Sequence, residues 1–243
     1  MSKAVLRKLA EIDSVCPPLH HVTDAFPILT NASVGVEHVE FFLTEIHPGG
    51  EAETDIHPIS EHAYFVISGV GESYVDGEKF IINPSECLYI PPNCKHSIKP
   101  VGGQTVRFLV FMTPPRNSET IKASGEGQKP VLRKLAEIDS VCPPLHHNTD
   151  AFPILTKASV GVEHVEFFLT EIHPGGEAET DVHPISEHAY FMVSGQGEAY
   201  VDGEKFIVGP SECLYIPPGA KHSIKPIGGQ TIRFVVFMAP PRQ

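Results

Sequence analysis

Two stretches of this 243-residue chain bring together side chains of types that bind metal ions. The first runs from Asp55 through His57 to His62, and the second repeats it from Asp181 to His188. On a strand, residues two apart point to one face about 6.6 Å apart along the backbone, so Asp55 and His57 can bend onto one ion. The spacing therefore predicts a metal site in each half of the chain.

The residues after His57 predict how the other histidines join it. Pro58–Ser60 is typical of a turn, which would place His62 across a hairpin from His57, with Cβ atoms about 5 Å apart. His96 follows a second turn-forming stretch, Pro91–Lys95. Imidazoles with a carboxylate suit Fe(II), Mn, Ni, Cu or Zn, and the residue types do not choose among these metals.

The predicted ligands thus form two equivalent sets. For the aspartates two interpretations stand: a direct ligand, or a carboxylate that orients the neighbouring histidine. For the histidines the alternative is a packed interior without metal. The candidate metal ligands are Asp55, His57, His62, His96, Asp181, His183, His188 and His222.

An internal repeat organises the rest of the chain. Val5–Arg116 matches Val131–Arg242 at a constant offset, with 97 of 112 positions identical. Two copies of this size predict two domains, each large enough for its own core. We expect a first domain over 1–116, a polar linker over 117–129 and a second domain over 130–243.

Each repeat shows the pattern of an all-β domain. Apolar and alternating runs predict short strands, and Asp76–Gly77 is typical of a two-residue type I′ hairpin. Eight short strands in each repeat predict a sandwich or a barrel. The expected strands are 39–47, 52–57, 62–68, 72–75, 79–82, 86–90, 96–99 and 105–112, with turns at 48–50 and 68–71, whereas 16–21 is irregular and 5–12 is ambiguous.

Composition excludes several classes of function. The net charge of −12 without a basic stripe argues against nucleic acid. The sequence contains no run of about 18 apolar residues, so no membrane span is expected. The N-terminal residues lack the apolar core of a signal peptide. Five cysteines without CxxC spacing predict reduced thiols. We therefore expect a cytoplasmic protein whose partner is a small molecule.

The motifs resemble those of the cupin family. Gly49, Asp55, His57, His62 and Gly69 follow the order of the first cupin signature, and the stretch that ends at His96 resembles the second. The resemblance implies a bicupin: two tandem double-stranded β-helix (jelly-roll) barrels, packed as a pseudo-dimer. It also implies one divalent transition metal per barrel, with Fe favoured. The N-terminal segment of each repeat is expected to extend a sheet, either its own or that of the other half.

The ligand pattern departs from the family. Asp55 stands where cupins usually have their first histidine, and His62 stands where they usually have glutamate. Without Asp55 a three-histidine face remains, a set also found among cupin-like oxygenases. A carboxylate in the first position resembles the ureidoglycine aminohydrolase bicupins, although the spacing before the second histidine differs there.

Other residues are candidates for catalysis. Period-two alternation places Tyr64 on the same face as His62, where its hydroxyl can steer a substrate or donate a proton; the same holds for Tyr190. The alternative for both is a core aromatic. His47 and His173 end the strand before the first motif and are candidate acids or bases, with a rim or surface position as the alternative.

Arg107 and Arg233 each lie within an apolar strand. A buried arginine there would bind a carboxylate substrate through two parallel hydrogen bonds. The alternative is a salt bridge on the exterior of the barrel.

Two functions follow from these residues. The first is a metal-dependent enzyme that acts on a small carbonyl, enol or aromatic carboxylate compound, as an Fe(II)-type dioxygenase or as a non-redox lyase, isomerase or aminohydrolase. The second is a cupin that binds a metal or small ligand without turnover. A cavity that opens onto the ion would favour the enzyme, and a sealed barrel would favour the binder. The sequence leaves homo-oligomerisation open.

Overall fold

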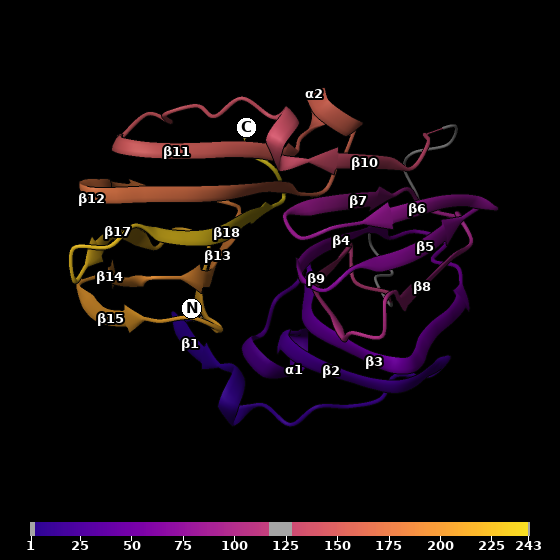
Figure 1. The fold of residues 1–243 in the computed structure, drawn as a ribbon. Coiled ribbons are helices and arrows are strands. Elements are labelled where there is room, and N and C mark those ends of the chain that lie inside the picture. Colours follow the sequence, from indigo (N-terminus) through magenta and orange to yellow (C-terminus); the bar gives the residue numbers. More distant parts are fainter. Residues whose placement is uncertain (1–2, 117–127, 243) are drawn as a thin grey trace. The chain divides into compact units, whose positions relative to one another are not determined.

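The structure, a computed structural model, describes residues 3–116 and 128–242 (Figure 1). These residues form strands, with one short α-helix and one 3-10 turn in each repeat. Residues 117–127 of the predicted linker lie outside the described residues. Within the described residues, no helix is long and apolar enough to cross a membrane.

The elements of the two repeats correspond closely. The first repeat contains β1 (Val5–Lys8), η1 (Leu9–Glu11), β2 (His20–Leu29), α1 (Asn31–Val34), β3 (Glu40–Asp55), β4 (Glu61–Ser68), β5 (Gly71–Val75), β6 (Glu78–Ile82), β7 (Glu86–Ile90), β8 (His96–Pro100) and β9 (Val106–Thr113). The second contains β10 (Val131–Lys134), η2 (Leu135–Glu137), β11 (His146–Leu155), α2 (Lys157–Val160), β12 (Glu166–Val182), β13 (Glu187–Ser194), β14 (Gln196–Val201), β15 (Glu204–Val208), β16 (Glu212–Ile216), β17 (Lys221–Ile227) and β18 (Ile232–Ala239).

The repeats exchange their first strands. β1 of the first repeat pairs antiparallel with β16, and β10 of the second repeat pairs antiparallel with β7; Figure 1 shows β10 beside β7. The N-terminal segment of each repeat therefore extends a sheet of the other repeat, one of the two arrangements expected.

Two compact units result from this exchange. The first-barrel unit comprises Ile12–Glu137 and Val160–His164, and the second-barrel unit comprises Met1–Glu11, Ile138–Ser159 and Val165–Gln243. Each unit has a nine-stranded sheet among its described residues. The division into domains over 1–116 and 130–243 remains our proposal for the folding units of the sequence.

One long strand gives each sheet its jelly-roll form. The first part of β3 pairs with β9 from Glu40 to Ile46, and its last part pairs with β8 from Ala52 to Asp55. β2 pairs along the other edge of β3. Because one strand changes its neighbour halfway along, the sheet curls over itself and encloses an interior, as the double-stranded β-helix requires.

The turn expected at 48–50 does not reverse the chain. β3 continues through it, with Gly49 in the left-handed region at φ 84°. A Cβ on Gly50 would lie 2.6 Å from the carbonyl oxygen of His21, so a glycine is needed where β2 approaches. The register shift between β2 and β3 at this point absorbs the extra residues. The glycines therefore mark a bulge in a strand, and β2 itself was not predicted.

The Asp76–Gly77 prediction is confirmed. Both residues have positive φ, 48° and 86°, and the strands on either side pair from Val75 to Glu78. Asn93 likewise adopts φ 66°, where the second repeat has Gly219 at φ 80°. These positions fix the loops that lead into the strands of the site.

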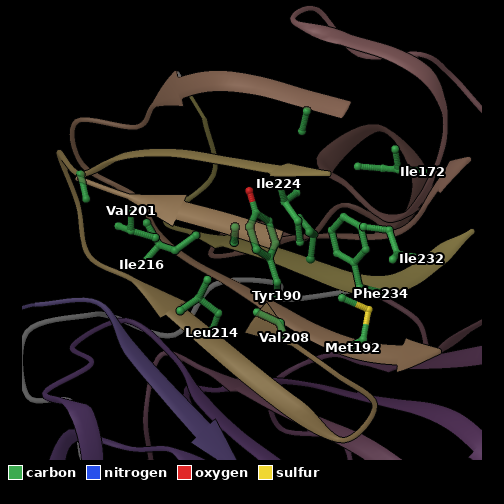
Figure 2. Packing of buried hydrophobic residues seen from close by; sticks show 14 residues of the cluster. Ile172, Tyr190, Met192, Val201, Val208, Leu214, Ile216, Ile224, Ile232 and Phe234 are labelled. Atoms are coloured by element: carbon green, nitrogen blue, oxygen red, sulfur yellow. The ribbon is translucent and has the colours of Figure 1, made fainter. Parts of the chain in front are cut away.

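Apolar side chains fill the interior of each barrel. Figure 2 shows the cluster in the second barrel, where Tyr190, Leu214 and Phe234 pack together with β-branched residues. The first barrel holds the equivalent cluster around Tyr64, Leu88 and Phe108. The exchanged strands contribute to both: Leu6 packs against the second cluster and Leu132 against the first.

Candidate metal centre

Three histidines converge inside each barrel. His57 follows the end of β3, His62 lies in β4, and His96 begins β8. Their ring centroids lie 4.9–5.0 Å apart, and all three side chains are buried. In the second barrel the centroids of His183, His188 and His222 lie 4.8–5.1 Å apart.

The strand pairing that positions them differs from the expected hairpin. β4 pairs with β7 and β9, not with β3, so the chain crosses from one side of the barrel to the other between His57 and His62. His96 lies directly opposite Asp55 in the pairing of β3 with β8. The site is therefore assembled from two sides of the barrel.

Hydrogen bonds orient the third histidine of each group. Nδ1 of His96 donates to the carbonyl oxygen of Cys94 at 2.9 Å, and Nδ1 of His222 donates to that of Ala220 at 3.0 Å. Because a carbonyl only accepts, the proton is on Nδ1 and the lone pair of Nε2 faces the other rings. Cys94 contributes only its backbone here, which explains why alanine serves in the second copy.

The nitrogen atoms fit a transition metal. Nδ1 of His62 lies 3.1 Å from Nε2 of His96, and two nitrogens bound side by side to one ion at about 2.1 Å would lie about 3 Å apart. Nε2 of His57 and Nε2 of His62 are buried without a hydrogen-bond partner. Each group offers three ligand nitrogens within 4.8 Å of one another. Among the described residues, these two buried groups of three histidines could each bind a metal; two further groups, around His21 and His147, are exposed mixtures of histidine and glutamate.

Burial keeps these imidazoles neutral. Loss of water contact, and secondarily the charge of Arg116, lowers the pKa of His57 to about 4. Burial also lowers the pKa values of His62 and His96, and those of the equivalent histidines in the second barrel. A neutral imidazole has the lone pair that a metal ion requires.

Asp55 lies at the edge of the three-histidine group. Its Oδ2 is 3.7 Å from Nε2 of His57 and 3.7 Å from Nη1 of Arg116, while Oδ1 accepts the backbone N–H of Ile56 at 2.8 Å. Asp181 has the same contacts with His183 and Val182. The aspartates thus neighbour the first histidine of each group, and both interpretations of their role remain predictions.

A cavity opens above the histidines of the first barrel. Its volume is about 360 Å³, and its walls include Phe42, Ile98 and Val110. Val15, half exposed, and Cys16 lie at its rim, so the cavity reaches the surface. The equivalent cavity of the second barrel has a volume of about 60 Å³.

Tyr64 lines this cavity, as the alternation along its strand predicted. Its ring lies 4.8 Å from that of His62 and 5.1 Å from that of Phe108, and the side chain is buried. Burial raises the pKa of its phenol, so the hydroxyl stays protonated at neutral pH. Tyr190 has the same environment in the second barrel.

The other two predicted residue pairs lie outside the cavity linings. His47 donates through Nε2 to Asp24 at 2.9 Å, and its Nδ1 lies 3.0 Å from the hydroxyl of Thr105. Arg107 pairs with Glu45 at 3.2 Å, because alternation along β9 turns it away from the cavity that Phe108 lines. His173 and Arg233 repeat these contacts. The geometry therefore gives the catalytic and substrate-binding roles proposed for them no support.

Three features of the cavity were not predicted. The segment Val15–Pro18 borders the mouth together with His20, although 16–21 was expected to be merely irregular. Glu40 and Arg116 also line it, from the start of β3 and from the chain after β9. In the sequence, the two adjacent prolines before Arg116 were the only indication that the strand ends and the chain turns there.

The 15 positions at which the repeats differ all lie outside the residues that line either cavity. Every residue that lines the second cavity therefore has an identical counterpart in the lining of the first. The counterparts of Val15, Cys16, Pro18 and Glu40 are absent from the lining of the smaller, second cavity.

Comparisons with known proteins agree with this fold. The chain is 24% identical over 154 residues to polyketide synthase CurC of Streptomyces cyaneus, covering 63% of this chain and 90% of the relative. Protein Ylba of E. coli has a similar structure, with a TM-score of 0.82 and 16% identity over 100% of this chain and 93% of the other. Oxalate decarboxylase of Lactobacillus farciminis gives a TM-score of 0.77 and 16% identity, over 98% and 87%.

The family model described as the cupin domain matches residues 42–112 and again residues 168–238. Both matches contain a complete three-histidine group, and together they cover more than half of the chain. The chain is therefore a bicupin, a member of the cupin domain family with two tandem barrels.

Proposed function

We propose that this bicupin is a metal-dependent enzyme that acts on a small carbonyl, enol or aromatic carboxylate compound, by an Fe(II)-dependent dioxygenation. The observation that carries the proposal is the cavity of about 360 Å³ that opens onto the three histidines of the first barrel. A protein that only stores a metal needs no such space, whereas a substrate needs room beside the ion.

The residues of the chain have distinct roles in this proposal. His57, His62 and His96 hold the ion as neutral ligands. When bound, Fe(II) would supply redox chemistry in which both atoms of O₂ enter the substrate, so that no external reductant is needed. The protonated phenol of Tyr64 donates a hydrogen bond to a substrate oxygen near the histidines. The apolar wall around Phe108 excludes water from the reacting groups.

The curated relatives support this class of substrate. CurC and TcmJ are both named as polyketide synthase proteins, TcmJ of Streptomyces glaucescens at 26% identity over 121 residues. Polyketides carry β-dicarbonyl, enol and phenol groups, which can approach a metal ion through their oxygen atoms. A compound of this kind, with an apolar body, suits the cavity walls.

The decisive experiment is elemental analysis of the full chain, followed by O₂ uptake with 1,3-diketones and phenolic acids. We expect about two Fe per chain and substrate-dependent O₂ uptake. The double variant His57→Ala/His183→Ala should lose the ion and the activity, while circular dichroism shows an intact β fold. Bound Zn, Mn or Ni without O₂ uptake would contradict the oxygenase and favour a non-redox lyase, isomerase or aminohydrolase. No metal after reconstitution would leave a ligand-binding cupin.

The thiols support a cytoplasmic location. All five cysteines are free, and Cys87, Cys94 and Cys213 are buried. A reducing compartment preserves such thiols. We therefore propose that the enzyme works in the cytoplasm, where Fe(II) also persists.

A further inference from the structure

The mouth of each cavity contains an arginine that changes its partner between the two barrels. In the first barrel, Nη1 of Arg116 lies 3.7 Å from Oδ2 of Asp55. In the second, Nε of Arg242 lies 3.4 Å from Oε2 of Glu166, the counterpart of Glu40. Both carboxylates are present in both barrels, so the same side chains adopt two arrangements.

Neither arrangement binds the arginine tightly. The side chains of Arg116 and Arg242 are 43% and 42% exposed, and the distances exceed those of a bidentate pair. Exposed ion pairs of this kind contribute little to stability. Arg116 also donates to the sulfur of Met112 at 3.1 Å, and the guanidinium of Arg242 lies 5.7 Å from the ring centre of Phe168. Each arginine can therefore exchange its carboxylate partner at little cost.

The position of the arginine fits one end of a ligand. Among the described residues that line the first cavity, Arg116 is the only side chain that is a cation at every physiological pH. Oδ2 of Asp55 lies 3.7 Å from both Nη1 of Arg116 and Nε2 of His57, so the arginine is close to the histidines. Apolar side chains, including Phe42, Val110 and Met112, line other parts of the cavity. A ligand in the cavity can therefore place a negative group against Arg116, beside the histidines, and an apolar body against these walls.

The other charges at the mouth restrict the ligand further. Glu40, Glu53 and Asp55 also line the first cavity. One carboxylate on the ligand can replace Asp55 as the partner of Arg116, but a second would face these acids without a cation of its own. The mouth therefore favours a single negative charge.

We propose that Arg116 and Arg242 bind the carboxylate of the substrate, and that the substrate is an organic monocarboxylate with an apolar body. This inference rests on the proposed function for the role of the histidines, and it names the substrate class. In the second barrel, Arg242 must leave Glu166 and Phe168 before the ligand enters, because the cavity there is only about 60 Å³.

The test uses benzoate and its neutral isostere benzamide as probes, titrated into the metal-free full chain and followed by ligand-observed NMR. Wild-type protein should bind benzoate, and Arg116→Gln/Arg242→Gln should weaken that binding at least tenfold while leaving benzamide binding unchanged. Arg116→Lys/Arg242→Lys keeps the charge but loses the planar fork, so it should restore only part of the affinity.

A matched control removes the same charge elsewhere. Lys79 and Lys205 are half-exposed and pair with Glu72 and Glu198 away from the cavities, so Lys79→Gln/Lys205→Gln should bind benzoate like wild type. Equal benzoate affinity in the arginine variant, an equal loss for benzamide, or no benzoate binding to wild type at millimolar concentration would each overturn the inference.

The same titration separates this inference from the proposed function. Metal-free protein reports on the arginine alone, so the benzoate result stands even where elemental analysis finds no metal. Conversely, the enzyme could bind metal and be active while its benzoate affinity is the same with and without the arginines. That result would keep the proposed function and reject a monocarboxylate substrate.

Discussion

The imidazoles of the metal centre are neutral because the barrel buries them. Their pKa values lie below the ordinary value near 6.5, that of His57 at about 4. The unfolded chain would therefore bind more protons than the folded chain between about pH 4 and pH 6.5. Protonation in this window favours unfolding, so the stability of the metal-free protein is complete above pH 6.5 and falls as the pH decreases.

We expect the free energy of unfolding of the metal-free protein to fall by at least roughly 2 kcal/mol between pH 7 and pH 5, since His57 alone accounts for about that much. Urea unfolding in the presence of a chelator, measured at a series of pH values, gives the slope of the free energy of unfolding against pH. His57→Gln/His183→Gln removes two of the buried imidazoles, so its slope should be shallower. An equal slope in both proteins would show that other groups cause the acid sensitivity.

The phenol of Tyr64 is kept protonated by the same burial. We expect Tyr64→Phe/Tyr190→Phe to retain both metal ions but to lower kcat on the order of 100-fold, because the substrate oxygen loses its hydrogen-bond donor. Tyr74→Phe/Tyr200→Phe changes two exposed tyrosines and is the control, with unchanged kcat. Loss of metal from the Tyr64→Phe/Tyr190→Phe variant would instead show that Tyr64 positions the histidines that bind the metal.

At the scale of secondary structure, each sheet depends on a strand from the other repeat. β1 pairs with β16 and β10 pairs with β7. Leu6 in β1 packs against the core of the second barrel, and Leu132 in β10 packs against the core of the first. Without β1, the backbone groups along one edge of β16 would lose their partners. The exchange therefore makes the stability of one unit sensitive to residues of the other repeat.

We expect Leu6→Ala to destabilise the second-barrel unit by about 1–2 kcal/mol. This is less than the cost of replacing a fully buried leucine, because Leu6 is only partly buried. Hydrogen exchange should show faster exchange in β16 and no change in β7. Leu132→Ala is the matched variant and should have the opposite pattern. Faster exchange in β7 from Leu6→Ala would contradict the strand assignment.

The strands also show what the sequence could and could not predict. His57 and His62 were found because their types and spacing lie within one short motif, and His96 was found because it ends a second motif of its own. Tyr64 was found because alternation along one strand suffices. Arg116 and the Val15–Pro18 segment reach the same cavity only when the sheet has curled, and no local pattern encodes that contact. β2 was missed because Pro27 and polar residues interrupt its alternation, and the 48–50 glycines were taken for a turn because their role is the close approach of β2.

Across the whole molecule, the two barrels carry the same chemistry. Every residue that lines the second cavity has an identical counterpart in the lining of the first, because the positions that differ between the repeats lie elsewhere. Each barrel has its own complete group of three histidines. Two independent and equivalent metal sites are expected from this arrangement.

We expect His57→Ala and His183→Ala, as separate single variants, each to lower the metal content from two ions to one per chain. The remaining ion should bind with the affinity found in wild type, and about half of the activity should remain. Metal titration of the two variants, with Tyr74→Phe as the control, measures both quantities. A single variant that loses both ions would show that the sites depend on each other.

The exchanged strands also impose an order on biosynthesis. β1 leaves the ribosome first, yet its partner β16 begins at Glu212, more than 200 residues later. β10, by contrast, follows β7 by about 40 residues and can pair with it as soon as it emerges. Until β16 has been made, the nascent chain carries a strand without a neighbour, an edge open to wrong pairing. A stop codon before Glu212 would therefore release a chain with one closed barrel and β1 still unpaired.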